Sequence, residues 1–312
     1  MRIRATVAGV TGALALSALV VPSAAQADDA HRSSTVLDAA RAAQAASGAQ
    51  SGAKSGARSV TAAGTAGVPL DLTFSKFTVN GGKPIAVGTS ATKTVATTYT
   101  VTHAADVDIF GADFALDVAL YRGSFDAPAN ELYGYKAPTC KAVSSTVATC
   151  KGQIDISPYY DLIGNADATT WKAVGFAVDF NGQDPTNPDP SQIDYAVQDG
   201  LGTTKLQRFS KLTVNASPEP VKKGRTITVT GKLSRANWDD LAYHGYATQS
   251  VKLQFRKKTS STYTTLKTIK SSSTGTLKTT ATASVDGYWR YSFAGTSTTP
   301  AVSAAGDYVD VQ

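Results

Sequence analysis

The stretch FSKFTVN at residues 74–80 recurs as FSKLTVN at residues 209–215, with six of the seven positions identical. Each copy is followed by a proline, a glycine and then a strand rich in threonine and valine, at residues 92–101 and 226–233. Two similar strand openings in the same order predict two related domains. Each predicted domain is near the usual size of a single β-sandwich.

The second copy has the clearer strand pattern. Residues 251–256 (VKLQFR) alternate between apolar and polar side chains, which is the period of a strand with one buried face. Residues 288–293 (YWRYSF) alternate in the same way, directly after Asp286-Gly287, a dipeptide that favours a tight hairpin turn. We therefore predict seven strands, the count of an immunoglobulin-like sandwich. They lie at 209–214, 226–233, 251–256, 263–269, 276–285, 288–293 and 307–311.

The first copy is longer and less regular. Its expected strands lie at 71–79, 92–102, 113–121, 143–150, 171–180 and 192–198, with insertions at 130–139 and 181–190. The predicted fold class is thus all-β, with two tandem immunoglobulin-like β-sandwich domains at residues 68–206 and 207–312.

Three motifs carry a family resemblance. The segments VKKGRTITVTGKL at 221–233, VKLQFRKK at 251–258 and DGYWRYSF at 286–293 resemble immunoglobulin-like repeats of secreted actinobacterial (Streptomyces-type) proteins. The resemblance covers residues 207–312 well and residues 68–206 loosely. It implies a spacer or binding module and brings no catalytic residues with it.

The N-terminus has the three parts of a secretory signal peptide. Residues 1–4 (MRIR) are basic, residues 7–21 are apolar, and residues 25–27 (AQA) form a small-x-small cleavage site before Asp28. No second apolar run follows, so we predict a secreted, extracellular protein without a membrane segment after signal cleavage. Residues 28–67 are rich in Ala, Ser and Gly and have little to bury, which predicts a disordered leader with at most a transient helix at 36–46.

The chain has two cysteines, Cys140 and Cys150. In an exported protein such a pair predicts a disulfide, and the ten-residue spacing fits neither a CxxC redox motif nor a zinc site. The pinned stretch 140–150 is also the one candidate for the exposed rigid loop of an enzyme inhibitor.

The charge is divided unevenly along the chain. The net charge is +6, but residues 68–208 carry 10 basic and 15 acidic groups, whereas residues 209–312 carry 14 basic and 6 acidic groups. The change of sign near residue 208 supports a domain boundary there. The excess of positive charge serves solubility or brings the second domain to an anionic surface.

The sequence has little catalytic chemistry. Its histidines are His31, His103 and His244, and its glutamates are Glu131 and Glu219. There is no HExxH pair, no GxSxG motif and no phosphate-binding loop. We therefore predict a protein that is not an enzyme. No nucleic-acid-binding motif is present, so nucleic acid is not an expected partner.

An acidic, proline-rich loop is the candidate metal site. Its oxygen ligands are of the kind that calcium prefers, and they come from Asp179, Asn181, Asp184, Asn187 and Asp189. The spacing is not that of an EF-hand, and Asp, Asn and Pro also form turns. Both a calcium site and a plain structural loop remain open.

A second candidate site lies in the second domain. The aromatic loop at 238–246 pairs flat rings with polar groups, as sugar-binding loops do, and a basic cluster at 256–258 offers charge to anionic polymers. The residues concerned are Trp238, Tyr243, His244, Tyr246, Arg256, Lys257 and Lys258. The more usual alternative is that these rings cover the end of the domain core and that the charges are solvated.

The predicted function is that of a non-catalytic secreted protein, a binding, adhesion or structural module. Its expected partner is a cell-wall polymer, a carbohydrate or another extracellular protein. The alternatives are a secreted enzyme inhibitor, a calcium-binding protein, or an enzyme with an unrecognised site.

Overall fold

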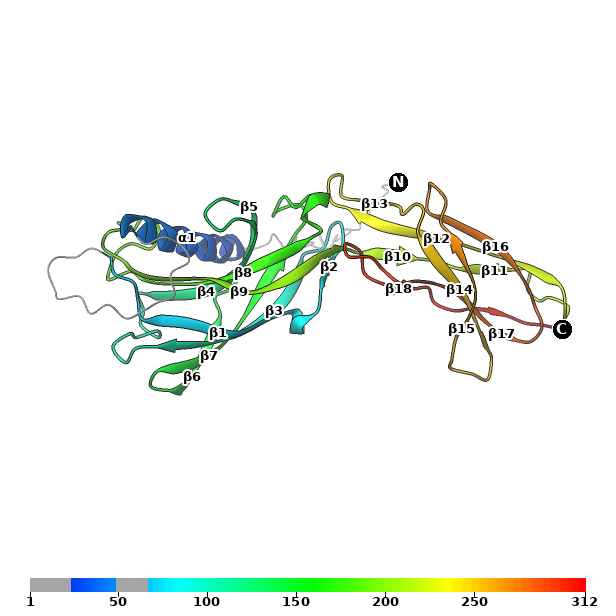
Figure 1. Ribbon diagram of the computed structural model, residues 1–312, viewed down its shortest axis with the longest axis horizontal. Coiled ribbons are helices and arrows are strands. Elements are labelled where there is room, and N and C mark those ends of the chain that lie inside the picture. The colour runs from blue at the N-terminus through cyan, green and yellow to red at the C-terminus, as the bar shows by residue number, and fades with distance from the viewer. Residues whose placement is uncertain (1–23, 49–66) are drawn as a thin grey trace, which may run out of the picture.

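A computed structural model describes residues 24–48 and 67–312. Apart from one long helix and two short 3-10 turns, these residues form β-strands arranged as two sandwiches that lie end to end (Figure 1). The all-β, two-sandwich fold expected from the alternating patterns is therefore present. Residues 1–23, which hold most of the predicted signal peptide, lie outside the described residues.

The first sandwich has a four-stranded sheet in the order β1-β3-β7-β6 and a five-stranded sheet in the order β2-β9-β8-β4-β5. Its strands are β1 (Leu72–Val79), β2 (Ile85–Val87), β3 (Lys93–His103), β4 (Phe114–Gly123), β5 (Pro128–Leu132), β6 (Thr139–Ser144), β7 (Val147–Ile156), β8 (Thr170–Asp179) and β9 (Asp194–Arg208). The short strands β2 and β5 and most of β6 lie outside the segments that the sequence predicted as strands. The single strand predicted at 143–150 is wrong, since a turn at 145–146 divides it between β6 and β7.

The two sheets of the first domain pack through alternate residues of each strand. In β3, for example, Val95, Thr97, Tyr99 and Val101 are buried, while Ala96, Thr98 and Thr100 lie outward. Gly175 of β8 belongs to the same inner layer, because a Cβ atom there would lie 2.5 Å from the ring of Phe74. A glycine at this position lets the Phe74 ring of β1 approach the opposite sheet.

The second sandwich also consists of two sheets. One sheet has the order β10-β12-β11 with β13 and β16 also on β12, and the other has the order β15-β14-β17-β18 with β19 on β17. Its strands are β10 (Ser210–Leu212), β11 (Asn215–Ser217), β12 (Thr226–Asn237), β13 (Ala242–Gly245), β14 (Ser250–Lys257), β15 (Thr264–Lys270), β16 (Thr276–Thr282), β17 (Gly287–Phe293), β18 (Val302–Ser303) and β19 (Asp307–Val309).

The repeated heptapeptide occupies equivalent places in the two domains. The first copy lies in β1, which pairs antiparallel with β3, and its register shifts between Ser75 and Thr78. The second copy spans β10 and the start of β11, both of which pair antiparallel with β12. Each copy therefore forms the first strand of its domain, with a break in its pairing. Its partner is a long strand that follows the proline turn, β3 in the first domain and β12 in the second.

The hairpin predicted at Asp286-Gly287 is wrong. Strand β16 pairs with β12, whereas β17 pairs with β14, β18 and β19, so the dipeptide connects two sheets instead of two neighbouring strands. The Asp286 carboxylate accepts hydrogen bonds from the Val311 amide at 2.9 Å and from the Tyr308 hydroxyl at 3.1 Å. It therefore anchors the last strand to this crossover.

The prediction of a disordered leader is wrong for the part of it that the structure describes. Residues Ala24–Ala46 form α1, which lies along the outer face of the five-stranded sheet of the first domain (Figure 1). Its buried side chains follow the helical repeat at Val36, Leu37, Ala40 and Ala43. The predicted cleavage after Ala27 falls in the first turn of α1 and leaves this packed stretch intact.

The side chains of the five-stranded sheet explain why α1 packs there. Beneath α1 the strands present large side chains, and the small alanines let the helix backbone come close to them. The covered residues are Ala119, Tyr121, Phe125, Val174, Phe176, Val178, Phe180, Ile193 and Tyr195. Polar contacts fix the position of the helix: Ser33 donates to Asp117 at 3.0 Å, and Arg41 contacts Glu131 at 2.5 Å.

The two domains are joined without a spacer. Strand β9 ends at Arg208 and β10 begins at Ser210. Trp238 of the second domain is 2% exposed and belongs to the same core as Ile85, Trp171 and Leu206 of the first. Its indole N–H donates to the carbonyl of Gly88 at 2.8 Å. A continuous core therefore crosses the boundary between the domains.

Within the described residues, no helix has the length and apolar character needed to cross a membrane.

Candidate functional site

The strongest candidate site is the outer face of one sheet of the second domain. In β17, Trp289, Tyr291 and Phe293 are buried, so the alternation sends Tyr288 and Arg290 outward. The register places Arg256 of β14 opposite Tyr288, and Tyr308 of β19 opposite Tyr288 on the other side. Together with Lys258 and Tyr263 from the connection between β14 and β15, these residues form what we call the cation–tyrosine face: Arg256, Lys258, Tyr263, Tyr288, Arg290 and Tyr308.

Each cation of this face lies over a tyrosine ring. The Arg256 guanidinium carbon is 3.8 Å from the centre of the Tyr288 ring, and that of Arg290 is 3.8 Å from the centre of the Tyr263 ring. The Lys258 ammonium is 5.2 Å from the Tyr308 ring centre. Cation–π contacts of this kind hold long side chains in one orientation.

Hydrogen bonds also hold the two arginine side chains in place. Arg290 donates through Nε to Gln254 at 2.8 Å, and Arg256 donates through Nη1 to the Ser260 carbonyl at 2.9 Å. Each guanidinium has five N–H donors, so the stacked planes keep further donors for a ligand. Planar guanidinium groups bind carboxylate and phosphate oxygens through paired hydrogen bonds.

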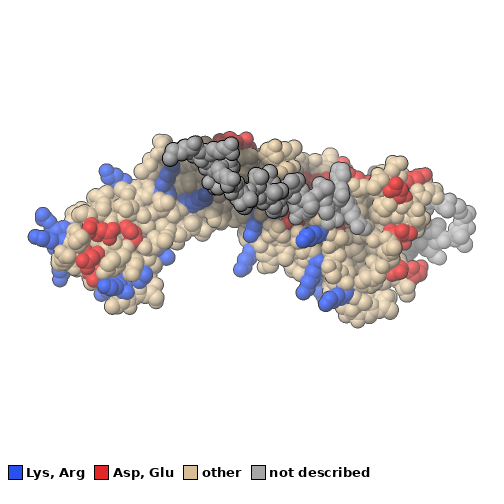
Figure 2. Space-filling view, turned by 180° about the vertical axis from the view of Figure 1, so that it is seen from behind, with Lys and Arg blue, Asp and Glu red and all other residues tan. Residues whose placement is uncertain are grey.

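Charge at the edge of the face is balanced locally. Lys258 lies 3.8 Å from Asp286, and its pKa is raised by the adjacent Tyr308 hydroxyl and by Asp286. The Val311 amide, which donates to Asp286, lowers the pKa of that carboxyl. Both basic and acidic side chains gather at the end of the second domain, while acidic groups dominate the far end of the first (Figure 2). The positive charge of the face is therefore concentrated at Arg256 and Arg290.

The aromatic loop predicted to bind sugar has another structure. Trp238 is buried at the domain junction, which leaves neither face of its indole open to a sugar, so its role is structural. Tyr243 carries the Lys211 ammonium 3.6 Å from its ring centre, and Tyr246 carries Arg235 at 3.9 Å. Their rings are thus already occupied by cations of the same domain.

His244 lies on β13 and is exposed. Its Nε2 lies 2.6 Å from the Asp240 carboxylate, which caps the turn before β13 by accepting from the Ala242 amide at 3.2 Å. The pair resembles two members of a catalytic triad, but no serine or cysteine contacts His244 among the described residues. It forms a local surface ion pair when the imidazole is protonated.

The residues of the predicted calcium site form turns. Asp184 and Asp189 each cap their own turn by accepting from the backbone N–H and the hydroxyl two residues on, at 2.8–2.9 Å. These bonds lower the pKa of both exposed carboxyls. Asp179 accepts from the Asn181 amide, and the Asn181 side chain donates to the Gln192 carbonyl. Asn187 donates its backbone N–H to the Asp184 carbonyl at 3.1 Å.

The described residues contain no group of three or more His, Cys, Asp or Glu side chains that could hold a metal ion. Turn formation accounts for the hydrogen bonds that the Asp and Asn residues of this loop make.

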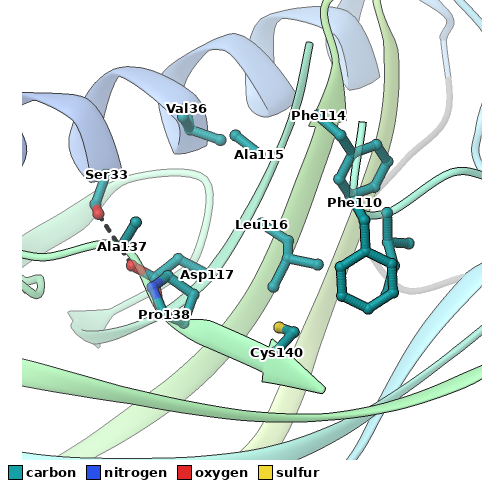
Figure 3. Close-up of a pocket in the computed structure, with 11 residues that line it drawn as sticks. Ser33, Val36, Phe110, Phe114, Ala115, Leu116, Asp117, Ala137, Pro138 and Cys140 are labelled. Carbon is teal, nitrogen blue, oxygen red and sulfur yellow. Dashed lines mark hydrogen bonds between the residues drawn. The ribbon is translucent and has the colours of Figure 1, made fainter. Parts of the chain in front are cut away.

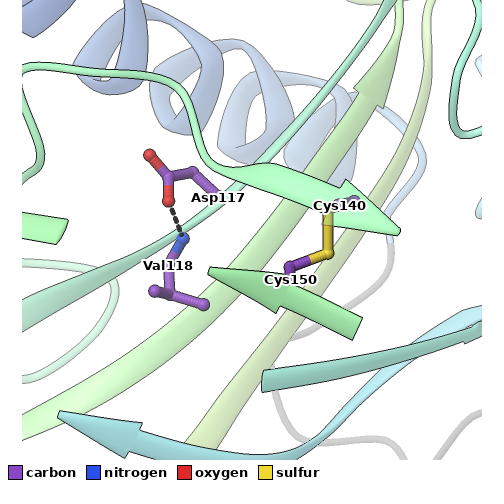
Figure 4. The surroundings of a disulfide bond; sticks show 4 residues. All are labelled: Asp117, Val118, Cys140 and Cys150. Atoms are coloured by element: carbon purple, nitrogen blue, oxygen red, sulfur yellow. Dashed lines mark hydrogen bonds between the residues drawn. A yellow bond between two sulfur atoms is a disulfide. The ribbon is translucent and has the colours of Figure 1, made fainter. Parts of the chain in front are cut away.

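The predicted disulfide is present. Cys140 and Cys150 are directly opposite in the antiparallel pair β6–β7, with Cα atoms 4.0 Å apart (Figure 4). The stretch between them is a regular hairpin with a turn at residues 145–146, so the disulfide joins two paired strands. This geometry does not present the extended, separately held loop that an inhibitor would insert into an enzyme.

A small cavity lies beside the disulfide. It has a volume of about 160 Å³ and lies between α1, β4 and β6, with apolar walls that include Val36, Phe110 and Leu116 (Figure 3). The one charged group that lines it is Asp117. Its carboxylate already accepts from Ser33 at 3.0 Å and from the Val118 amide at 2.8 Å (Figures 3 and 4). We assign Asp117 to the docking of α1.

Sequence reasoning found part of the cation–tyrosine face. Arg256 and Lys258 were predicted, whereas Lys257 ends β14 and makes none of the ring contacts that the described residues show. Tyr263, Tyr288, Arg290 and Tyr308 were missed as site residues. The outward positions of the YWRYSF strand were the available signal, since they place Tyr288 and Arg290 on the face opposite the core.

Comparison with known proteins gives structural matches alone. No family model matches the sequence, and no curated protein matches it. Among solved structures, the adhesin InvE of Yersinia pseudotuberculosis matches over 77% of this chain with 12% identity and a TM-score of 0.22. The ectodomain of mouse nectin-like molecule 4 (Ig1–Ig3) matches over 78% with 14% identity and a TM-score of 0.21.

The Escherichia coli adhesin FdeC matches over 77% of this chain with 11% identity and a TM-score of 0.26. The chain spans 58%, 65% and 64% of the lengths of these three structures, respectively.

Proposed function

We propose that this protein is a secreted, non-catalytic binding protein whose second domain holds an anionic extracellular polymer on the cation–tyrosine face. The ligand class is a polymer with regularly spaced carboxylate or phosphate groups, such as an anionic cell-wall polymer. Secretion follows from the N-terminal signal pattern and agrees with the disulfide between Cys140 and Cys150.

The observation that carries this proposal is the stacking of Arg256 and Arg290 on tyrosine rings of an uncovered sheet face. Free arginine side chains lose conformational entropy when they bind, whereas these two guanidinium groups are already held in position. Each guanidinium has more N–H donors than the one hydrogen bond uses, and such donors suit oxyanions along a chain.

The packed junction between the domains supports a role in which the first domain holds the cation–tyrosine face in a fixed position for binding. Because Trp238 is packed in the core of the first domain, the face is held at a fixed position relative to that domain. A rigid pair of domains offers a binding face without the entropy cost of ordering a linker.

The test is retention of the mature chain on purified anionic cell wall at low and high salt. We expect retention at low ionic strength that falls as salt is added, because exposed charges are screened over about 8–10 Å near physiological salt. The double variant R256Q/R290Q should lose most of this retention. No retention of the wild-type chain at low salt would exclude the proposal.

A matched control is available on the other sheet of the same domain. Lys232 of β12 and Lys278 of β16 lie at exposed positions of the second sheet, away from the cation–tyrosine face. The variant K232Q/K278Q removes the same charge. Equal loss of retention in both double variants would show that net charge, and not the face, holds the polymer.

A further inference from the structure

A second exposed aromatic cluster lies in the first domain, in the connection between β7 and the 3-10 turn η2 (Asn165–Asp167). Tyr159, Tyr160 and Leu162 are 64%, 75% and 83% exposed. The rings of Tyr159 and Tyr160 lie edge to face at 5.1 Å with an interplanar angle of 84°, so they form two perpendicular walls. We call residues 157–162 the tyrosine loop.

The tyrosine loop is held by its own hydrogen bonds. The Asp161 carboxylate accepts from the Ser157 amide at 2.6 Å, and the Asp161 amide donates back to the Ser157 carbonyl at 3.0 Å. Asn130 of β5 donates to the Asp161 carbonyl at 3.3 Å. Leu162 has a φ of 50°, a left-handed conformation that is uncommon for a bulky residue and that clusters at binding sites.

A third tyrosine lies beside the loop. Tyr135 donates its backbone N–H to Asp155 at 2.8 Å. Burial, followed by the nearby charges of Asp161 and Asp155, raises the pKa of Tyr135 to about 12. Asp161 is itself half-buried, and burial together with Asp155 raises its pKa to about 6. The charges of both carboxyl groups therefore reach Tyr135, and Asp161 belongs to the loop that carries Tyr159 and Tyr160.

The tyrosines of this chain differ in whether a basic side chain lies over the ring. The chain has 13 tyrosines, and six of them carry a Lys or Arg over the ring: Tyr121, Tyr243, Tyr246, Tyr263, Tyr288 and Tyr308. Of the rest, Tyr99, Tyr195 and Tyr291 are buried, and Tyr133 donates to Glu131 at 2.6 Å.

Tyr135, Tyr159 and Tyr160 remain. Across residues 24–48 and 67–312, no Lys or Arg lies over these three rings, and no basic side chain forms an ion pair with Asp155 or Asp161. The cluster thus has the π faces and the negative charge that the other tyrosines of this protein use to hold a cation, but it holds none of its own.

We propose that the tyrosine loop, together with Tyr135, binds an alkylammonium group. The cation lies against the faces of Tyr159 and Tyr160, with Asp161 supplying negative charge and the exposed Leu162 contacting the alkyl chain. Ammonium cations are attracted to the negative face of an aromatic ring, and the attraction grows when carboxylates lie close by. The group is either the side chain of a lysine on a partner or the trimethylammonium head of a choline-bearing molecule.

The test is a titration of the full mature chain with choline and with N-acetyl-lysine methylamide, followed by the NMR resonances of the tyrosine rings. The neutral isostere 3,3-dimethylbutan-1-ol replaces choline in a parallel titration. We expect saturable shifts of the Tyr159 and Tyr160 resonances with at least one cation and much weaker shifts with the isostere. The stronger of the two cations identifies the source of the ammonium group.

Variants locate the site. Y160L and D161N should each weaken the binding roughly two- to fivefold, the effect of losing one cation–π or charge contact at an exposed site. Y308L is the matched control, because Tyr308 lies in the second domain and has its own lysine. Unfolding midpoints of all variants in urea show whether the loop remains folded, and R256Q/R290Q should bind the cations as the wild type does.

Three outcomes would overturn the inference. Equal shifts with the cation and the isostere would show a merely apolar patch. Shifts with N-acetylglucosamine and none with either cation would show a sugar platform. The absence of saturable shifts with both cations would show that the loop has no ligand of this class. None of these outcomes bears on the polymer face of the second domain.

Discussion

At the scale of single residues, Asp117 has the most unusual environment. It is 3% exposed under α1, and its pKa is raised to about 7, chiefly by burial, against the hydrogen bonds from Val118 and Ser33. Besides Val118, the described groups that interact with it include Ser33 of α1 and Tyr99 of β3, and neither is a cation. The ionised form of Asp117 is therefore disfavoured in the folded protein.

This carboxyl predicts a pH dependence of stability. Its folded pKa is higher than its unfolded value near 3.8, so the folded state binds the proton more tightly. Stability from this group is complete below about pH 4 and is lost as pH rises through about 7, by roughly 3–5 kcal/mol in total. Urea unfolding of the wild type between pH 5 and 8 should show this slope.

The variant D117N removes the titration. An asparagine amide accepts from the Val118 N–H and donates to the Ser33 hydroxyl, as the protonated acid does. We expect D117N to match the wild type at or below about pH 4 and to be more stable at pH 8. Parallel pH curves for the two proteins would contradict the assigned role of Asp117.

At the scale of elements, α1 depends on small side chains. Ala40 is fully buried against the sheet, while Ala42 is exposed on the opposite side of the helix. We expect A40L to lower the free energy of unfolding by about 1–3 kcal/mol, because extra methylene groups do not fit a packed interface.

Hydrogen exchange of the α1 amides should rise in the same variant, while the control A42L should change neither quantity. If A42L weakened α1 as much as A40L does, the close helix–sheet contact would not be the cause.

The hairpin β6–β7 gives a second element-scale prediction. The disulfide joins residues ten apart in sequence, so the double variant C140S/C150S should lose about 2–3 kcal/mol of unfolding free energy by the loop-entropy argument. Denaturation with urea checks the value. Reducing agent should lower the stability of the wild type to that of the variant and leave the variant unchanged.

The sequence predicted correctly those elements whose signal lies within a short stretch of neighbouring residues. The alternation at 251–256 and 288–293 predicted β14 and β17, and the paired cysteines predicted the disulfide. Helix α1 was missed because the large residues of its interface lie on the sheet, far away in sequence, and alanines alone show no apolar stripe. A core role for Trp238 was among the alternatives, but its packing partners were missed for the same reason, since they belong to the other domain.

The candidate site was partly predictable for a related reason. The basic cluster at 256–258 is visible in the sequence, but the tyrosines that orient Arg256 and Arg290 come from β17 and from the segment after β14. Their pairing depends on strand register, which a sequence pattern does not specify across two strands.

At the scale of the whole molecule, the junction between the domains is a structural unit of its own. Trp238 fills a space among Ile85, Trp171 and Leu206, and the side chain of Arg208 donates to the Ala236 carbonyl at 2.6 Å. We expect W238A to lower stability by about 3–5 kcal/mol, the usual cost of removing a buried tryptophan.

In the same variant, the two domains should unfold independently of each other. Calorimetry of the wild type should show one transition, since the cores are continuous, whereas W238A should show two. Small-angle scattering should report a longer or more variable particle for W238A. A single transition at a lower temperature, with unchanged scattering, would mean that Trp238 stabilises one domain without coupling the two.

The place of α1 in the chain also determines when it can fold. It is the first described element to be synthesised, yet the residues that hold it come much later: Asp117 is 84 positions from Ser33, and Glu131 is 90 positions from Arg41. Contacts between such distant residues close long loops and form late. The helix therefore leaves the ribosome long before its place exists, and it docks when the first sandwich is complete.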